Sequence, residues 1–431
     1  MPRHTRLIPL AGAVALSAGL SAFEMDQVLT GELLVEGVNR NNYTDGEDAR
    51  NDRVSKMQIR AALGTEIEFD DRAMIKLGFV YDAEGGDRSD PDEDLRESVT
   101  LNDAYLQLKQ FIRPELHVRI GRQPVAWNLR KNDGGFIYDS RADDPVVTRW
   151  DGVRAYWEVD NFTISPFAFI IDEATEPDPD TGERGRNSDD TYFWGITGDW
   201  LPDRMGDDRM FLTGSLSVAR KVPLAGGETG DELHTYYAGA EWKLAHDIDL
   251  YAEGGVQDGE VDNSRDFSGW ALSVGAQWAF PDASLSPVIN AQYDHFSGNE
   301  DGDDDYKAFV VPWEGVSDTY IVEHERYGEL SELLVGNLEA VKLTIEQAYF
   351  EEILTLKAVY GYYKTVEDVG GENDFGNEFD LTLSWKYNDF TTFRAWGAVF
   401  LPGEAYRAVA PASETDDDTV TLFGISGHVT F

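Results

Sequence analysis

The spacing of segments in which apolar and polar residues alternate is the feature that most constrains the fold. A period of two predicts about eighteen strands in the 431-residue chain. The predicted strands are 28–39, 53–69, 73–82, 97–111, 115–121, 151–160, 162–171, 191–201, 209–220, 232–244, 248–258, 268–280, 284–296, 336–347, 351–364, 375–388, 390–401 and 419–431. The gaps between them alternate between short turns, such as 70–72 and 112–114, and long connections, such as 40–52 and 122–150. Tight turns therefore lie at one edge of the predicted sheet and long loops at the other.

An even number of antiparallel strands with unequal turns and loops is typical of outer-membrane barrels. A water-soluble sandwich is the alternative, because its loops can also differ in length, but sustained alternation over this many hairpins favours the barrel. About eighteen strands enclose an interior wide enough for an aqueous channel unless loops fill it. The sequence therefore predicts an all-β fold, a transmembrane antiparallel β-barrel with short periplasmic turns and long extracellular loops.

The two faces of single strands support this interpretation. In segment 378–387, Phe379 and Leu381 alternate with Glu378 and Asp380, and segments 57–69 and 270–280 show the same alternation. In a large barrel the apolar face meets lipid and the polar face lines water. The polar face is therefore the predicted functional surface.

Both ends of the chain indicate export to an outer membrane. Positive residues precede an apolar run, 7–20, which is too short for the roughly 20 residues of a membrane-spanning helix and is typical of a signal peptide cleaved after Ala18 or Ala22. Segment 419–431 alternates up to Phe431, and it resembles the last strand of bacterial outer-membrane barrels, where a final aromatic residue is the assembly signal. We therefore predict a signal peptide at 1–22 and a barrel at 23–431 in the outer membrane of a Gram-negative bacterium. The expected partners there are lipid, lipopolysaccharide and, through Phe431, the barrel-assembly machinery.

Composition excludes several functions. The chain has 36 Lys plus Arg against 81 Asp plus Glu, and its net charge of −45 argues against nucleic acid or anionic lipid as the main ligand. An acidic exported surface adapted to a saline habitat also explains this charge. There are no cysteines, so disulfides, thiol nucleophiles and Cys-based zinc sites are excluded. The 11 Trp, 19 Tyr and 22 Phe agree with aromatic girdles at both edges of a bilayer.

Two pairs of motifs resemble a known family. Val118-Arg-Ile-Gly-Arg-Gln123 and Trp150-Asp-Gly-Val-Arg-Ala-Tyr156 resemble the GRQ and DGVR core of the alginate export porins. Segments 324–330, 376–387 and 400–403 are similar to the C-terminal half of that family, so the resemblance spans roughly residues 28 to 431. It implies an eighteen-stranded outer-membrane barrel through which an anionic polysaccharide or another small solute passes.

The predicted inner wall carries both charges. Its cations are Arg60, Lys76, Lys109, Arg119, Arg154, Lys342, Lys357, Lys386 and Arg394. Its acids are Glu66, Glu68, Asp103, Glu158, Asp249, Glu253, Asp294, Glu346, Glu378 and Asp380. Many of these charges are expected to pair with neighbours across strands. A pore for a polyuronate should be lined with cations that replace the lost water. The predicted selectivity residues are Arg60, Lys109, Arg119, Arg122, Arg130, Lys131, Arg154 and Arg394.

Segment 122–150 is the predicted constriction. It gathers Arg122, Arg130, Lys131, Arg141 and Arg149, together with Trp127, Phe136 and Tyr138. Folded into the lumen, such a loop would select anions or stack on sugar rings. The alternative is a surface loop whose cations pair with the acidic loops beside it.

Metal binding and catalysis receive weaker support. Asp301, Asp303 and Asp305 supply oxygen atoms of the kind that calcium prefers, without the spacing of an EF-hand. We expect at most loosely bound Ca²⁺ and no other cofactor. No G-x-S-x-G or H-E-x-x-H motif is present, so no enzyme is predicted. The predicted function is a passive channel for small or polymeric solutes of anionic or saccharide character. The alternatives are a barrel that sheathes a periplasmic partner and an outer-membrane enzyme assembled across strands.

Overall fold

The structure is a computed structural model. It describes residues 25–41, 54–69, 71–87, 96–125, 149–172, 191–201, 210–224, 229–245, 247–262, 264–281, 283, 285–300, 305–310, 318–323, 336–350, 353–409 and 419–431. The predicted signal peptide, 1–22, lies outside these residues.

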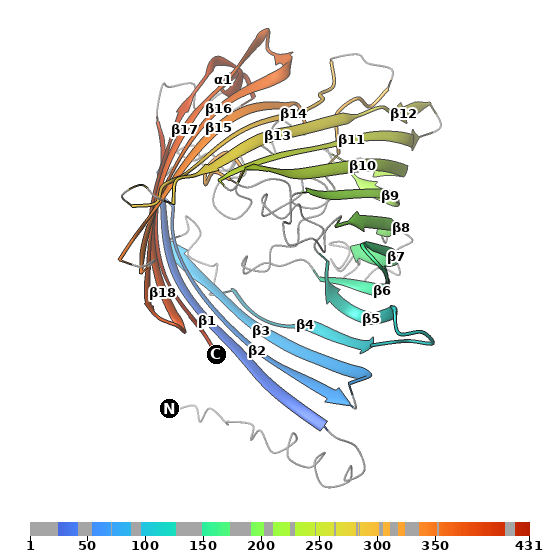
Figure 1. The fold of residues 1–431 in the computed structure, drawn as a ribbon. Helices are drawn as coiled ribbons and strands as arrows, with labels where there is room; N and C mark the ends of the chain where they lie inside the picture. The colour runs from blue at the N-terminus through green and yellow to red at the C-terminus, as the bar shows by residue number, and fades with distance from the viewer. Residues whose placement is uncertain are drawn as a thin grey trace, which may run out of the picture.

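The described residues form one closed antiparallel sheet (Figure 1). Its strands are β1 (Met25–Asn41), β2 (Val54–Phe69), β3 (Ala73–Asp87), β4 (Arg96–Leu108), β5 (Leu116–Pro124), β6 (Arg149–Val159), β7 (Phe162–Asp172), β8 (Thr191–Trp200), β9 (Met210–Pro223), β10 (Thr229–Ala245), β11 (Ile248–Asp262), β12 (Arg265–Phe267), β13 (Trp270–Ala279), β14 (Val288–Phe296), β15 (Leu338–Tyr349), β16 (Leu354–Val369), β17 (Glu372–Asn388), β18 (Thr391–Pro402) and β19 (Val420–Thr430). β12 and β13 pair with successive parts of β11, so the ring has eighteen strand positions. The predicted fold class is confirmed, and each predicted strand has its counterpart.

One helix was not predicted. α1 (Glu404–Val409) follows β18 directly. Its Ala405 and Tyr406 are buried, and the Tyr406 ring centre lies 5.6 Å from that of Phe375 and 5.4 Å from that of Phe400. The helix is six residues long, which is too short for a helical period to stand out in a sequence.

The outer surface of the barrel is apolar, and the inner surface holds the charges. On β17, Phe379 and Leu381 are 50% and 52% exposed, whereas Glu378 and Asp380 are 0% and 5% exposed. This arrangement is inverted relative to a water-soluble protein, and it fits a wall whose outer face contacts lipid. In the described part of the chain, no helix is long and apolar enough to cross a membrane.

The barrel closes between its first and last strands. β1 pairs with β19 from Glu32 and Thr430 onward, and the C-terminus lies beside β1 (Figure 1). The Gly31 N–H donates to the Phe431 carbonyl at 2.8 Å, and the Phe431 N–H donates to the Gly31 carbonyl at 3.0 Å. The Phe431 ring covers Gly31 so closely that a Cβ there would lie 2.2 Å from it. The last residue is therefore part of the seam, and its role as an assembly signal stays a prediction.

The loop end of the lumen is partly filled by the connection between β14 and β15. Two described pieces of it, 305–310 and 318–323, lie on the inner wall. Gln257 of β11 bonds both backbone groups of Val310, at 2.8 Å each. Phe309, Ile321 and Val322 are 0–1% exposed and belong to one buried apolar cluster with inward residues of the strands. These pieces therefore cover part of the inner wall instead of leaving it open to water.

Gly121 of β5 is a position where the backbone itself requires glycine. Its φ is +120°, and a Cβ would lie 2.2 Å from the Ala104 carbonyl oxygen of β4. Gly121→Ala should lower the free energy of unfolding by about 1–3 kcal/mol through backbone strain alone, and further through the clash. The measurement is denaturant unfolding of the refolded barrel in detergent.

Gly198 of β8 supplies the matched control, because a Cβ there meets no atom within 4 Å. Gly198→Ala should leave the unfolding midpoint close to that of the unsubstituted barrel. Equal midpoints for both variants would contradict the strain assigned to Gly121.

Candidate functional site in the lumen wall

Arg119 and Arg154 form a basic patch on the inner wall. The register of β5 and β6 places them directly opposite each other. Two like charges at opposed positions disfavour the sheet, so such a pair needs compensation. Arg119 is partly exposed and Arg154 is 7% exposed, so Arg119 is the one that reaches the lumen more fully.

Two tyrosines and an amide hold these guanidinium groups. The Arg119 guanidinium carbon lies 4.5 Å from the centre of the Tyr105 ring, and that of Arg154 lies 4.4 Å from the Tyr156 ring. Arg119 also donates through Nε and a terminal nitrogen to Gln107 Oε1, at 3.3 and 2.8 Å. A cation over an aromatic face is stabilised without losing its charge. Arg119 is therefore held in place by groups that leave its positive charge in effect.

The other predicted cations of this wall are in cross-strand ion pairs. Arg60 lies 3.2 Å from Asp82, and Lys76 lies 2.9 Å from Glu66. Lys109, just beyond the end of β4, pairs with Glu68. Cross-strand pairing of lining charges, which the mixed charges of the predicted inner wall led us to expect, occurs at these positions.

Arg394 lies on the inner side of β18, is exposed, and follows the same alternation as the buried Trp396.

Arg122 lies elsewhere than expected. It falls on the outer side of β5 with Ile120, and its Nε donates to Asp151 Oδ1 of β6 at 3.0 Å. The physical reason is the pleat: β5 continues to Pro124, and Arg122 is an odd number of residues from Arg119, so it points away from the lumen. Counting alternation onward from Arg119 would have found this. Arg122 is therefore not part of the lumen patch.

Several predicted residues lie outside the described residues. These are Arg130, Lys131 and Arg141 of the predicted constriction, and Asp301 and Asp303 of the predicted calcium site. Asp305 is described, and its Oδ1 accepts from the Asp266 backbone N–H at 3.4 Å. Among the described residues, no group of three or more acidic or histidine side chains is arranged to hold a metal ion. The calcium site and the constricting role of 122–150 stay predictions.

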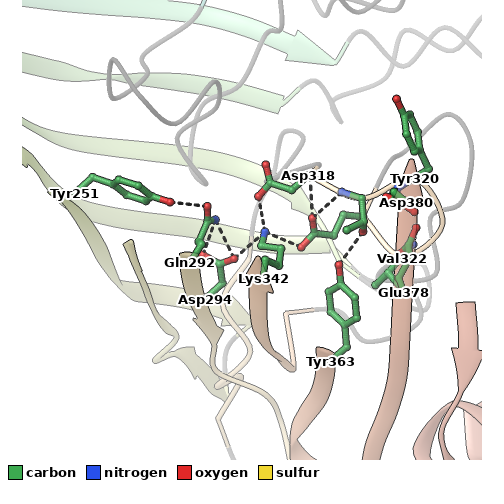
Figure 2. A network of polar contacts seen from close by, with 12 residues as sticks. Tyr251, Gln292, Asp294, Asp318, Tyr320, Val322, Lys342, Tyr363, Glu378 and Asp380 are labelled. Atoms are coloured by element: carbon green, nitrogen blue, oxygen red, sulfur yellow. Dashed lines mark hydrogen bonds and ion pairs between the residues drawn. The ribbon is translucent and has the colours of Figure 1, made fainter. Parts of the chain in front are cut away.

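A second site, which the sequence did not indicate as a unit, surrounds Lys342 of β15 (Figure 2). Its Nζ lies 2.8 Å from Asp294 of β14, 2.6 Å from Asp318 and 2.9 Å from Glu323. The Lys342 and Asp294 side chains are 2% and 1% exposed. Gln292 donates to both oxygens of Asp294 at 3.0 Å, and the Tyr251 hydroxyl donates to Gln292 at 2.8 Å. One ammonium group thus joins the strand wall to the inserted segment 318–323.

The same segment is bound to β17 through its backbone. The N–H groups of residues 321 and 322 donate to the two oxygens of Glu378, at 2.6 and 2.9 Å, and that of Tyr320 donates to Asp380 at 3.0 Å. Glu323 accepts from the N–H groups of 318 and 319, at 2.8 and 3.3 Å. Five consecutive N–H groups therefore end on carboxylates. Side chains add to this: Thr319 bonds Tyr363 at 2.7 Å, and the Tyr320 ring stacks on Trp396 with centres 5.9 Å apart.

The electrostatics of this site depend on burial. Burial raises the pKa of Glu323 in the inserted segment to about 7, the Lys342 ammonium opposes the rise, and Asp318 and Asp294 add to it. When segment 318–323 is bound to the inner wall, the pKa of Glu323 is raised, so protonation of Glu323 favours the bound (seated) segment. Seating is therefore favoured at low pH and weakens as the pH rises through that pKa.

The sequence pattern predicted the wall residues of this site but not the inserted segment. Asp294, Lys342, Glu378 and Asp380 were predicted inward by alternation, and they are. Their partners in 318–323 lie in a long connection without any periodic pattern, so no local signal pairs them with the wall. The apolar residues at 321–322, like those at 308–311 of the same connection, are the sequence signal that indicates burial.

A closed eighteen-strand barrel with an apolar outer face and a charged inner wall defines an outer-membrane channel of the porin type. The family model described as alginate export matches residues 36–418. The chain therefore belongs to the alginate export family.

Solved structures show the same fold at low sequence identity. OccAB1 of Acinetobacter baumannii has a TM-score of 0.62 and 11% identity, with 94% of this chain and 96% of that one covered. OpdQ of Pseudomonas aeruginosa has a TM-score of 0.60 and 11% identity, with 94% and 99% covered. OccK2 (OpdF) of Pseudomonas aeruginosa, solved in complex with glucuronate, has a TM-score of 0.58 and 12% identity, with 94% and 98% covered. A search of curated proteins found no match.

The raised pKa of Glu323 predicts a pH-dependent seating of the inserted segment. Amide exchange of residues 319–322, corrected for intrinsic rates, should quicken between pH 5 and pH 8 in the unsubstituted protein. Glu323→Gln keeps the shape and removes the titration, so its protection should change little over that range. An identical pH response in both proteins would show that another group is responsible.

Proposed function

We propose that the channel conducts carboxylate-bearing saccharides, of the uronate type, by passive diffusion along the wall formed by β2 to β6. The observation that carries the proposal is the opposed pair Arg119 and Arg154 beside Tyr105 and Tyr156. Guanidinium groups bind carboxylates through paired, charge-assisted hydrogen bonds. Of the two aromatic residues beside them, Tyr105 is 7% exposed and Tyr156 is partly exposed, so Tyr156 offers the surface on which a sugar ring can stack. A charged sugar unit needs both.

The passage of such a solute requires exchange of water for protein donors. A carboxylate that enters the lumen loses hydration, and the Arg119 guanidinium can donate hydrogen bonds in place of that water while the buried Arg154 adds its charge. Binding must also be weak enough for the solute to leave. The tyrosines and Gln107 already engage Arg119, so a solute competes with existing contacts, which limits how tightly it is held.

The family and one fold neighbour support this solute class. The family is described as alginate export. OccK2 was solved with glucuronate, a single uronate, so a barrel of this fold accommodates such a ligand. The net charge of −45 does not oppose the proposal, because selectivity depends on charges within about a Debye length, roughly 8–10 Å, of the solute path.

The double variant Arg119→Ala and Arg154→Ala tests the proposal. Each contact of this kind contributes about 0.5 kcal/mol, or a factor of roughly 2.3, so the loss of both should lower the anion-to-cation permeability ratio roughly fivefold. The measurement is the reversal potential of the refolded channel in a salt gradient, followed by block of the current with uronate oligomers.

Arg122→Ala is the control, because it removes one guanidinium group from the outer side of the wall. Its permeability ratio should equal that of the unsubstituted channel. An unchanged ratio in the double variant would refute the role given to Arg119 and Arg154. A correctly folded barrel without any conductance would favour a scaffold that sheathes a periplasmic partner.

A further inference from the structure

The acidic part of the inner wall is covered, and the cover is a piece of the chain itself. Asp294, Glu378 and Asp380 project inward from β14 and β17, and they are 1%, 0% and 5% exposed. Segment 318–323 lies on them and supplies the hydrogen bonds described above (Figure 2). On the wall of β2 to β6, by contrast, Lys76 pairs with Glu66 and Lys109 pairs with Glu68, and these four side chains are 25–37% exposed. These charges face the open lumen, whereas the carboxylates under segment 318–323 do not.

The contacts replace the water that the carboxylates of the wall would otherwise bind. Glu378 and Asp380 accept hydrogen bonds from three backbone N–H groups of the segment. Lys342 forms ion pairs with Asp294 of the wall and with two acids of the segment. A buried carboxylate needs such donors, since desolvation without them is costly. If the segment left the wall, the same carboxylates would face water and their charge would act on the lumen.

We propose that segment 318–323 is a charge mask that sets the selectivity of the channel. Seated on β14 to β17, it hides the acidic wall and narrows the lumen, so that a crossing solute meets the basic patch of Arg119 and Arg154. The solute class assumed here rests on the proposed function, but the masking itself does not. Selectivity thus arises from covering one wall as much as from placing arginines on the other.

Lys342→Met tests the mask. The substitution removes the ammonium shared by Asp294, Asp318 and Glu323, and the three adjacent carboxylates then repel the segment from the wall. Single-channel conductance should rise, and the anion-to-cation permeability ratio should fall several-fold.

Lys357→Met is the charge-matched control. Lys357 lies on β16, next to the strand of Lys342, and is paired in register with Glu346. Lys357→Met also removes one positive charge, but it leaves the ion pairs of Lys342 with Asp294, Asp318 and Glu323 intact. Its conductance should stay at the unsubstituted value, with only a small change of the permeability ratio. Equal conductance and equal ratios in the two lysine variants would overturn the proposal.

Two further variants separate unmasking from misfolding. Tyr320→Ala removes the stacking on Trp396 and the 2.9 Å bond to Thr382 without changing any charge, and it should shift conductance and ratio in the same direction as Lys342→Met. Adding Glu378→Gln and Asp380→Asn to Lys342→Met should return the ratio toward anions while the conductance stays high. Failure of that return would also overturn the proposal.

The outcomes for the mask and for the proposed function remain distinct. If the solute assignment is wrong, the double arginine variant leaves the permeability ratio unchanged, yet Lys342→Met still raises conductance above Lys357→Met. If the mask is wrong, the lysine variants agree with each other while the arginine variant still lowers the ratio.

Discussion

The constraint on which the structure depends is that a backbone in lipid must satisfy all its hydrogen bonds within the protein. Eighteen strand positions do so only because the ring closes, and closure rests on the pairing of β1 with β19. The last bonds of that pairing join Gly31 to Phe431. An aromatic ring there needs a partner without a side chain, which Gly31 provides. The final residue of the chain is thus fixed by the geometry of the seam.

Closure in turn decides where charge can reside. The outer face is given to lipid, so nearly all ionisable groups must lie inside, at the rims or in loops. The charged groups inside lie close to one another, and they are stabilised in two ways. On β2 to β6 the charges pair across strands or lie against aromatic rings. On β14 to β17 the acids accept hydrogen bonds from the backbone of an inserted segment.

The periodic features of the strands could be predicted from the sequence, and the contacts of the non-periodic connections could not. Alternation predicted the strands, their count and the inward position of Glu378 and Lys342, because a pleat transmits one simple rule along each strand. It misplaced Arg122 because the end of β5 was set too early, and one odd step reverses the side of the wall. The partners of Lys342 in 318–323 could not be predicted, since contacts between a loop and a distant strand depend on tertiary packing and leave no periodic trace.

The net charge of the chain and the charge that a solute meets are therefore separate quantities. Described acids such as Glu66 and Glu378 have partners where they lie, and salt screens the effect of distant charges. The solute feels the groups within a Debye length, and which groups those are depends on what covers the wall. Under the proposed charge mask, a change at Tyr320, which carries no charge, alters the field in the lumen by moving segment 318–323. Charge selectivity in such a barrel is a property of its packing as well as of its composition.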